Sequence, residues 1–276
     1  MSLPRFGPHD DPGPDFAALL RLTASGPEAG PLGPAAQHPQ APPEIPHGTT
    51  CVAVRYDSGV VLAGDRRATA GHLISNHRIE KVFPADRHSG VAIAGAAGPS
   101  TEMVRLFQLQ LEHYEKVEGT PISLEGKANQ LGQMVRANLP AAMQGLVVVP
   151  IFAGFDTVAS RGRIFEYDVT GGRYEERDHA ATGSGSLHAD TVVKLGFRPS
   201  MARTAAVDLA LDALYVASDA DAATGGPDPV RGVFPVVAVI DADGYVRLDD
   251  AELRRRTERL LRRHRSRREG GKGGAS

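Results

Sequence analysis

The chemistry of this chain is suggested first by Gly48-Thr49-Thr50, where a proline-rich segment gives way to β-branched and apolar residues. A threonine hydroxyl is a weak nucleophile at neutral pH, and one way to activate it uses the threonine's own α-amino group as the base. The unperturbed pKa of that amine is about 7.7–8.0, which suits proton transfer near neutral pH. This chemistry requires the chain to be cut between Gly48 and Thr49.

The Gly-Thr-Thr sequence by itself also fits an ordinary loop that enters a strand. A glycine before the cut is physically favourable, because it places no side chain beside the carbonyl under attack and it tolerates a tight turn. The choice between the two interpretations depends on residues further along the chain.

The segment before Thr49 differs in composition from the rest of the chain. Residues 1–48 contain 11 of the 20 prolines. Proline fixes φ and lacks an amide donor, so this segment is expected to join neither a sheet nor a long helix. We predict a mostly irregular appendage with one short helix at 15–22, although composition alone also fits a disordered tail.

The bulk composition excludes several classes of protein. The formal net charge of −2 gives no general attraction for nucleic acid, and no apolar run reaches the roughly 18 residues of a membrane helix. The single cysteine, Cys51, permits no internal disulfide, which is typical of the cytoplasm, where we expect this protein. Cys51 lies in an apolar run and is expected to be inert. No histidine, cysteine and carboxylate cluster has metal-ligand spacing, so we expect neither a metal nor a cofactor.

Hydrophobic periodicity predicts strands, two helices, strands, two helices and closing strands. The predicted strands are at 49–56, 59–65, 79–83, 89–94, 146–155, 163–169, 173–178, 233–240 and 245–248. The predicted helices are at 100–117, 124–139, 187–196 and 202–218, with Ser123 as the cap of the second. Nearly continuous apolar strands indicate sheets covered on both faces. We therefore predict an α+β fold, a four-layer helix–sheet–sheet–helix sandwich of antiparallel sheets.

A set of short motifs in a fixed order resembles the β subunits of proteasome core particles. The motifs are Thr49-Thr50, Ala63-Gly64-Asp65-Arg66-Arg67, Ile79-Glu80-Lys81-Val82, Ile93-Ala94-Gly95, Gly183-Ser184-Gly185-Ser186 and the run at 221–228. The resemblance covers residues 47–248 and is most similar to the actinobacterial branch. It implies a threonine peptidase with the N-terminal nucleophile hydrolase fold.

The resemblance also implies a role for each matching catalytic position. Thr49 would supply the nucleophilic hydroxyl and, once the leader is removed, the amine. Lys81 would lower the proton affinity of both groups through its charge, and Asp65 would pair with Lys81 and orient it. The amide of Gly95 would donate a hydrogen bond to the oxyanion.

Three further positions, Ser184, Asp221 and Thr224, resemble the residues that position the threonine amine and a catalytic water. Many relatives carry serine where Thr224 stands, and the hydroxyl is kept here.

Four positions resemble the lining of a specificity pocket: Ala68, Ile79, Ile93 and Ala97. All are small or apolar, so we expect a preference for apolar residues before the scissile bond. Ile79 and Ile93 fit core packing equally well.

The expected protein is therefore the catalytic β subunit of a proteasome core particle. It would remove its propeptide, residues 1–48, by self-cleavage between Gly48 and Thr49, and degrade unfolded proteins through an acyl-ester, with residues 49–250 as the peptidase domain. The resemblance implies seven-membered β rings in a four-ring stack, with proteasome α subunits and ATPase or other activator rings as partners. No nucleic-acid or membrane partner is expected.

Two alternatives remain. One is the simpler bacterial threonine protease with a dodecameric core, of the heat-shock-locus V type, whose mature chain is shorter and whose leader is minimal. The 48-residue leader and the run at 221–228 argue against it. The other is a non-catalytic structural β subunit that serves only in ring assembly. The presence of every matched catalytic residue argues against it.

The end of the chain, residues 251–276, lies beyond the resemblance and is strongly basic from Arg254 to Lys272. Such a segment fits contact with nucleic acid or an acidic neighbour. We expect instead a solvated, mobile tail.

Overall fold

Two five-stranded antiparallel sheets form the centre of the computed structural model, which describes residues 48–270 and the side chains up to residue 266. The first sheet contains, in spatial order, β10 (His179–Gly183), β1 (Thr50–Tyr56), β2 (Gly59–Gly64), β11 (Val236–Asp241) and β12 (Gly244–Arg247). The second contains β5 (Val82–Asp86), β6 (Ser89–Gly95), β7 (Val148–Asp156), β8 (Arg161–Tyr167) and β9 (Arg173–Glu176). A separate hairpin pairs β3 (Ala68–Ala70) with β4 (Leu73–Asn76).

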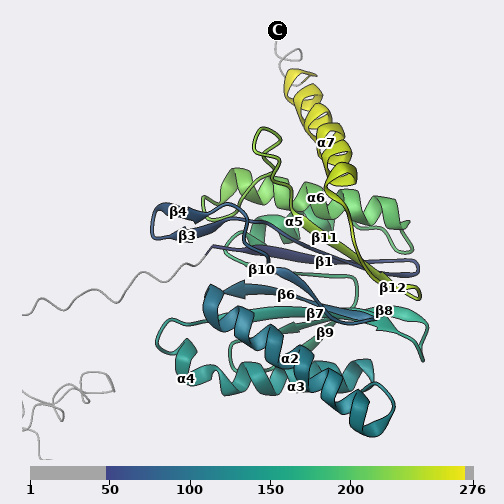
Figure 1. The fold of residues 1–276 in the computed structure, drawn as a ribbon. Helices are drawn as coiled ribbons and strands as arrows, with labels where there is room; N and C mark the ends of the chain where they lie inside the picture. The colour runs from purple at the N-terminus through teal and green to yellow at the C-terminus, as the bar shows by residue number, and fades with distance from the viewer. Residues whose placement is uncertain (1–47, 271–276) are drawn as a thin grey trace, which may run out of the picture. The chain divides into compact units, whose positions relative to one another are not determined.

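Helices cover the outer faces of both sheets (Figure 1). The helices of the described chain are α2 (Ala97–Glu118), α3 (Leu124–Ala137), α4 (Leu139–Ala142), α5 (Ser186–Gly196), α6 (Arg203–Ala220) and α7 (Asp250–Gly270). Helices α5 and α6 pack on the first sheet, and α2 and α3 pack on the second. The predicted four-layer α+β sandwich is confirmed.

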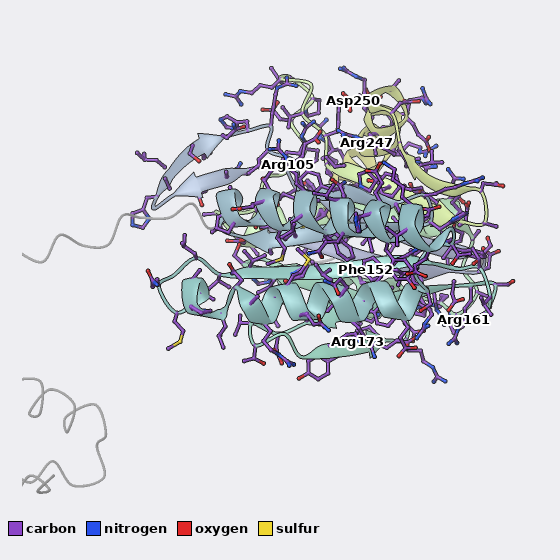
Figure 2. All side chains as sticks on the ribbon, turned by 60° about the horizontal axis from the view of Figure 1, so that its bottom comes forward. Arg105, Phe152, Arg161, Arg173, Arg247 and Asp250 are labelled. Carbon is purple, nitrogen blue, oxygen red and sulfur yellow. The ribbon has the colours of Figure 1, made fainter. Side chains whose placement is uncertain are left out.

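The core has three apolar layers, one between the sheets and one under each helix pair. The layer under α2 and α3 is centred on Phe152 of β7, whose ring lies 5.9 Å from that of Phe107 and 6.0 Å from that of Phe165 (Figure 2). The strands have apolar side chains on both faces because each sheet is covered on both faces.

Most element boundaries agree with the sequence patterns. Ser123 caps α3 as predicted, since its side chain accepts a hydrogen bond from the amide of Gly126 at 3.1 Å. The helix ends at Ala137, and only Asn138 separates it from helix α4, which has Pro140 in its first turn. Strands β3, β4 and β10 were not predicted, and each has only three to five residues.

The register of the first sheet brings three chain segments to one edge. Strand β1 lies between β10 and β2, with Thr50 opposite Gly183 and Cys51 opposite Gly64. Because both pairings are antiparallel, the start of β1 meets the ends of β2 and β10. The residues that flank these three strand ends, including Thr49 and Asp65, are therefore neighbours in space.

The second sheet supplies a fourth segment at the same place. Val82 at the start of β5 pairs with Ala92 near the end of β6. The carbonyl of Lys81, just before β5, accepts a hydrogen bond from the amide of Ile93 at 2.8 Å. The main chain at Lys81 is thus fixed by β6, and its side chain reaches the edge of the first sheet.

The basic C-terminal segment corrects an expectation. Residues 250–270 form helix α7 where a mobile tail was expected, and residues 271–276 lie outside the described part, as does the predicted helix at 15–22. Leu253 and Leu260 are buried in the same apolar layer as α6. Arginines surround these two leucines in the sequence, so the apolar stripe that they form is sparse and the charge pattern hides it.

Two arginines of α7 also form ion pairs with α6. Arg256 lies 2.6 Å from Asp208, and Arg263 lies 2.9 Å from Asp212. These carboxylates are distant in sequence, so only the folded chain reveals them as partners. Among the described residues, no helix is long and apolar enough to cross a membrane.

Candidate active site

The peptide bond expected to be cut lies at the centre of a buried polar cluster. The hydroxyl of Thr49 donates a hydrogen bond to the carbonyl oxygen of Gly48 at 2.7 Å, and the ammonium of Lys81 donates to the same oxygen at 2.8 Å. The Thr49 side chain is only slightly exposed, with 5% of the residue accessible. In the full-length chain the Thr49 nitrogen is an amide, so it is not yet a free amine.

Gly48 is fitted closely into this site. A Cβ added there would lie 2.6 Å from the hydroxyl oxygen of Thr69 and 2.8 Å from the carbonyl oxygen of Ala223. Both distances are shorter than a carbon–oxygen van der Waals contact. The space at this position therefore suits glycine and no larger residue.

The side chain of Lys81 makes two further hydrogen bonds. Its Nζ lies 2.6 Å from Oδ1 of Asp65 and 2.6 Å from the carbonyl oxygen of Arg67. With the Gly48 carbonyl, these acceptors satisfy all three ammonium donors. The Lys81 and Asp65 side chains are 3% and 0% exposed, so the pair is buried and its position is fixed.

Asp65 organises the main chain around the site. Its Oδ1 also accepts a hydrogen bond from the amide of Thr50 at 2.8 Å. Its Oδ2 accepts from the amides of Arg67 and Gly225, each at 2.8 Å. One carboxylate thus joins the start of β1, the end of β2 and the loop after α6. The predicted pairing of Asp65 with Lys81 is present.

The loop after β10 holds the carbonyl of Thr49. The amide of Ser184 donates to this oxygen at 2.8 Å, and the Ser184 hydroxyl lies 3.4 Å from it. Gly183, just before, has φ of 99°, and a Cβ there would lie 1.9 Å from the same oxygen. A left-handed glycine is required for this close approach.

The three residues predicted to position the threonine amine and a water, Ser184, Asp221 and Thr224, form one hydrogen-bonded chain. The hydroxyls of Ser184 and Thr224 donate to Oδ2 of Asp221 at 2.6 and 2.5 Å. The Thr224 hydroxyl also lies 2.5 Å from that of Thr50. Burial acts to raise the pKa of Asp221, but the hydrogen bonds from Ser184, Thr224 and the amide of Ala223 outweigh it and hold the pKa below its usual value.

Gly95 occupies the end of β6, with φ of 122°. A Cβ there would lie 2.0 Å from the carbonyl oxygen of Val147, so this backbone also excludes a side chain. Between residues 48 and 270, no hydrogen bond joins Gly95 to Thr49. Its role as oxyanion donor toward a substrate remains a prediction.

The four predicted pocket residues lie in different environments. Ala68 is buried in β3, whereas Ile79 and Ala97 are partly exposed. Ile93 is 3% exposed and packs in the apolar layer under α2 and α3. Core packing is therefore one role of Ile93, and the specificity role of the four residues stays a prediction.

Cys51 lies inside β1 and is fully buried. Burial raises the pKa of its thiol to about 12, so it is not a thiolate at neutral pH. Among residues 48–270, no group of three or more histidine, cysteine or carboxylate side chains is arranged to hold a metal ion.

Several groups in the cluster were quoted in the sequence motifs without an individual role. They are the Thr50 hydroxyl, the Arg67 carbonyl, Gly183 and the amide of Gly225. Three of these four act through the main chain, which leaves no signature in residue type. Only the two glycines gave a sequence signal, since each belongs to a glycine-rich motif.

The comparisons with known proteins agree with this geometry. The family of proteasome subunits matches residues 45–230. A proteasome subunit beta of Acidimicrobium ferrooxidans is 61% identical over 255 residues, which are 92% of this chain and 91% of the relative. A proteasome subunit beta of Acidothermus cellulolyticus is 59% identical over 213 residues, 76% of this chain and 73% of the relative. The chain therefore belongs to the proteasome subunit family, as a β-type member.

Proposed function

We propose that this chain is a threonine endopeptidase, the catalytic β subunit of a proteasome core particle. One observation carries the proposal: the Thr49 hydroxyl and the Lys81 ammonium both donate to the carbonyl oxygen of Gly48. The hydroxyl is thus beside the carbonyl group that it would attack, and a buried cation lies where negative charge would develop.

The self-cleavage step follows from these contacts. The Thr49 Oγ1 attacks the Gly48 carbonyl carbon, and Lys81 stabilises the resulting oxyanion. The C–N bond then breaks, the hydroxyl proton passes to the leaving nitrogen, and Gly48 is held as an ester on Thr49. Water hydrolyses this ester, which releases residues 1–48 with a C-terminal carboxylate and leaves Thr49 with a free amine.

The same groups would serve peptide hydrolysis afterwards. The new α-amino group takes the hydroxyl proton of Thr49, the hydroxyl attacks a peptide carbonyl, and the amine-bearing fragment leaves. Water then hydrolyses the acyl-ester. Ser184, Asp221 and Thr224 would position the amine and this water, and Gly95 would donate its amide to the oxyanion.

Assembly is proposed from the relatives, which are described as proteasome β subunits. We expect seven-membered β rings within a four-ring stack, together with proteasome α subunits and an activator ring. Closed rings would sequester a broad peptidase site from folded proteins, so that unfolded chains are its substrates. The buried, reduced Cys51 is consistent with the cytoplasm.

The test is the N-terminal sequence and intact mass of the protein after co-expression with its α partner. The expected product begins at Thr49, and the Thr49→Ala variant keeps its leader and lacks peptidase activity. Leader removal in Thr49→Ala would refute self-cleavage.

The remaining alternative, a structural β subunit without activity, makes a different prediction. An assembled particle would then keep its leader, and a covalent probe directed at an N-terminal threonine would label nothing. Labelling of the wild-type chain at Thr49, with none in Thr49→Ala, would exclude this alternative.

A further inference from the structure

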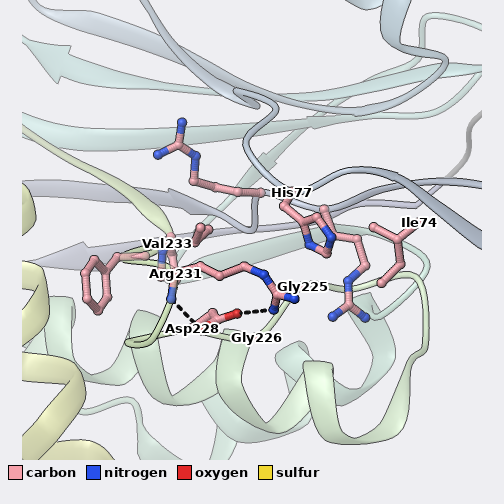
Figure 3. Close-up of a pocket in the computed structure, with 11 residues that line it drawn as sticks. Ile74, His77, Gly225, Gly226, Asp228, Arg231 and Val233 are labelled. Atoms are coloured by element: carbon pink, nitrogen blue, oxygen red, sulfur yellow. Dashed lines mark hydrogen bonds and ion pairs between the residues drawn. The ribbon is translucent and has the colours of Figure 1, made fainter.

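A cavity of about 310 Å³ adjoins the candidate active site. Gly225, whose amide binds Asp65, is part of its wall. The charged or titratable side chains that line it are Arg66, Arg67, His77, Asp228 and Arg231. In Figure 3, His77 and Ile74 lie on one side, and Asp228 and Arg231 lie on the other. The wall therefore has three arginines and one carboxylate.

That carboxylate is already neutralised. Oδ2 of Asp228 lies 2.7 Å from Nη1 of Arg231, and Oδ1 accepts a hydrogen bond from the Arg231 amide at 2.9 Å. The main chains of Asp228 and Val233 exchange two hydrogen bonds that close this loop. The charges of Arg66 and Arg67 are thus left without a carboxylate inside the cavity.

The two adjacent arginines have unsatisfied donors. The Nε atoms of Arg66 and Arg67 are buried, yet neither has an acceptor in the part of the chain that the structure describes. Buried polar groups without a partner are uncommon, and for a guanidinium N–H they are costly. Nη2 of Arg66 and Nη1 of Arg67 donate to the main-chain carbonyls of Arg78 and Ala222 at 3.1 and 2.9 Å, so neither guanidinium is paired with a carboxylate inside the cavity.

The nearest carboxylate compensates Arg66 only weakly. Oε1 of Glu80 is 3.9 Å from Nη2 of Arg66, and the same oxygen pairs more closely, at 2.8 Å, with Arg247. Burial, and then repulsion from Arg247, lower the pKa of Arg66, while Glu80 and Asp250 act to raise it.

We propose that this cavity binds a small multivalent oxyanion, such as inorganic phosphate, between Arg66, Arg67 and Arg231. Guanidinium groups present planar pairs of donors that match phosphate oxygens. The volume also admits a small phosphorylated compound, because it is within the range of small-molecule pockets.

The site is coupled to the proposed catalytic pair through the main chain of Arg67. The Arg67 amide donates to Asp65 at 2.8 Å, and the Arg67 carbonyl accepts from Lys81 at 2.6 Å. An anion that fixes Arg67 would fix this pair and speed leader removal. This consequence rests on the proposed function, whereas anion binding itself does not.

Binding can be measured on the full-length Thr49→Ala chain, whose intact mass is checked before each titration to show that the leader is present. Isothermal titration calorimetry with inorganic phosphate should give about one site per chain. The thermal midpoint should rise with phosphate concentration as mass action requires, and should not rise with sodium chloride of matched ionic strength. Pyrophosphate tests whether a larger anion fits.

Variants locate the site. Arg231→Gln and Arg66→Gln should each weaken phosphate binding at least tenfold, and Arg231 is exposed enough to be replaced without loss of folding. Arg161→Gln is the matched control, since Arg161 is exposed on β8 and does not line the cavity. Equal phosphate binding by Arg231→Gln, Arg66→Gln and wild type would overturn the proposal, as would a wild-type response no larger than that to chloride.

A last experiment tests whether the cavity binds a free anion or an acidic side chain of a neighbouring subunit. The titration is repeated on the particle assembled with its α partner. Retained phosphate binding supports the free-anion site. Binding by the isolated chain that disappears on assembly means that a neighbouring subunit fills the cavity, and it overturns the proposal for the working particle.

Discussion

The Lys81 ammonium lies 2.8 Å from the carbonyl oxygen of Gly48, although 33 positions separate the two residues in sequence. The Thr49 hydroxyl donates to that same oxygen. A buried cation and a nucleophile therefore meet at one peptide bond. This arrangement makes Lys81 the residue on which leader removal should depend most directly after Thr49.

Replacing Lys81 by methionine should slow leader removal by a factor of about 10²–10³ or more, the usual effect of losing one oxyanion donor. Lys81→Arg should also process slowly, because three acceptors fixed around a side chain that is 3% exposed leave no room for a planar guanidinium. The rate is followed by the appearance of the Thr49 N-terminus.

Lys81→Met alone leaves Asp65 buried without its cation, which costs about 3–5 kcal/mol. The double variant Lys81→Met/Asp65→Asn removes both charges and should unfold at a higher temperature than the single variant. If the folded double variant releases its leader at the wild-type rate, Lys81 has no part in the chemistry.

Gly183 should be essential for the position of Thr49. Its φ of 99° and a Cβ position 1.9 Å from the Thr49 carbonyl oxygen mean that alanine would strain the loop and displace Thr49. We expect Gly183→Ala to lose about 1–3 kcal/mol of unfolding free energy, and to release its leader more slowly. Urea denaturation and intact mass measure the two effects.

Gly98 provides the matched control. It lies in the first turn of α2, and a Cβ there would have no atom within 4 Å. Gly98→Ala should keep the wild-type processing rate and raise stability by up to about 1 kcal/mol. Equal effects of the two substitutions would contradict the argument from close approach.

The buried ion pair between Asp86 and Lys127 should make stability depend on pH. Burial acts to raise the pKa of Asp86, but Lys127, Ser89 and the His88 amide together hold it below its usual value. The stabilisation is therefore fully present above the unfolded pKa of about 3.9 and is lost as the pH falls through the lower folded pKa. Denaturation between pH 6 and acid conditions measures it.

Lys127→Met should cost about 3–5 kcal/mol near neutral pH, because it leaves the Asp86 carboxylate buried alone. The variant should also lose less stability on acidification than wild type, since protonation of Asp86 then relieves an unpaired charge. Lys116→Met is the control, because Lys116 pairs with Glu112 on an exposed helix face. This variant should change neither the stability at neutral pH nor its loss on acidification. Identical acid profiles of wild type and Lys127→Met would exclude the pair as their cause.

Helix α7 should contribute to the stability of the domain. Leu253 is 2% exposed in the apolar layer shared with α6, so Leu253→Ala should cost about 2–5 kcal/mol. Leu195→Ala removes the same atoms from a side chain that is 74% exposed and should cost almost nothing. A mobile tail predicts no loss in either variant, and chemical denaturation distinguishes the two cases.

The sequence by itself determined the layer order and the identity of the chemical groups. Apolar residues recur with a different period in strands than in helices, so their pattern along the chain predicted the sandwich. Ser123 was recognisable as the cap of a helix. The motifs around Thr49, Asp65 and Lys81 gave the reactive groups, because hydroxyl, carboxylate and ammonium chemistry depends on residue type.

Tertiary structure alone decided which groups meet. Arg67 contributes a main-chain amide and a main-chain carbonyl, and every residue except proline carries both groups, so residue type gave no sign of them. The charge pattern at the end of the chain predicted a mobile tail, whereas burial of Leu253 and Leu260 against α6 and the ion pairs with Asp208 and Asp212 hold a helix there. Contacts between distant segments depend on sheet register and helix packing, which no local stretch of sequence specifies.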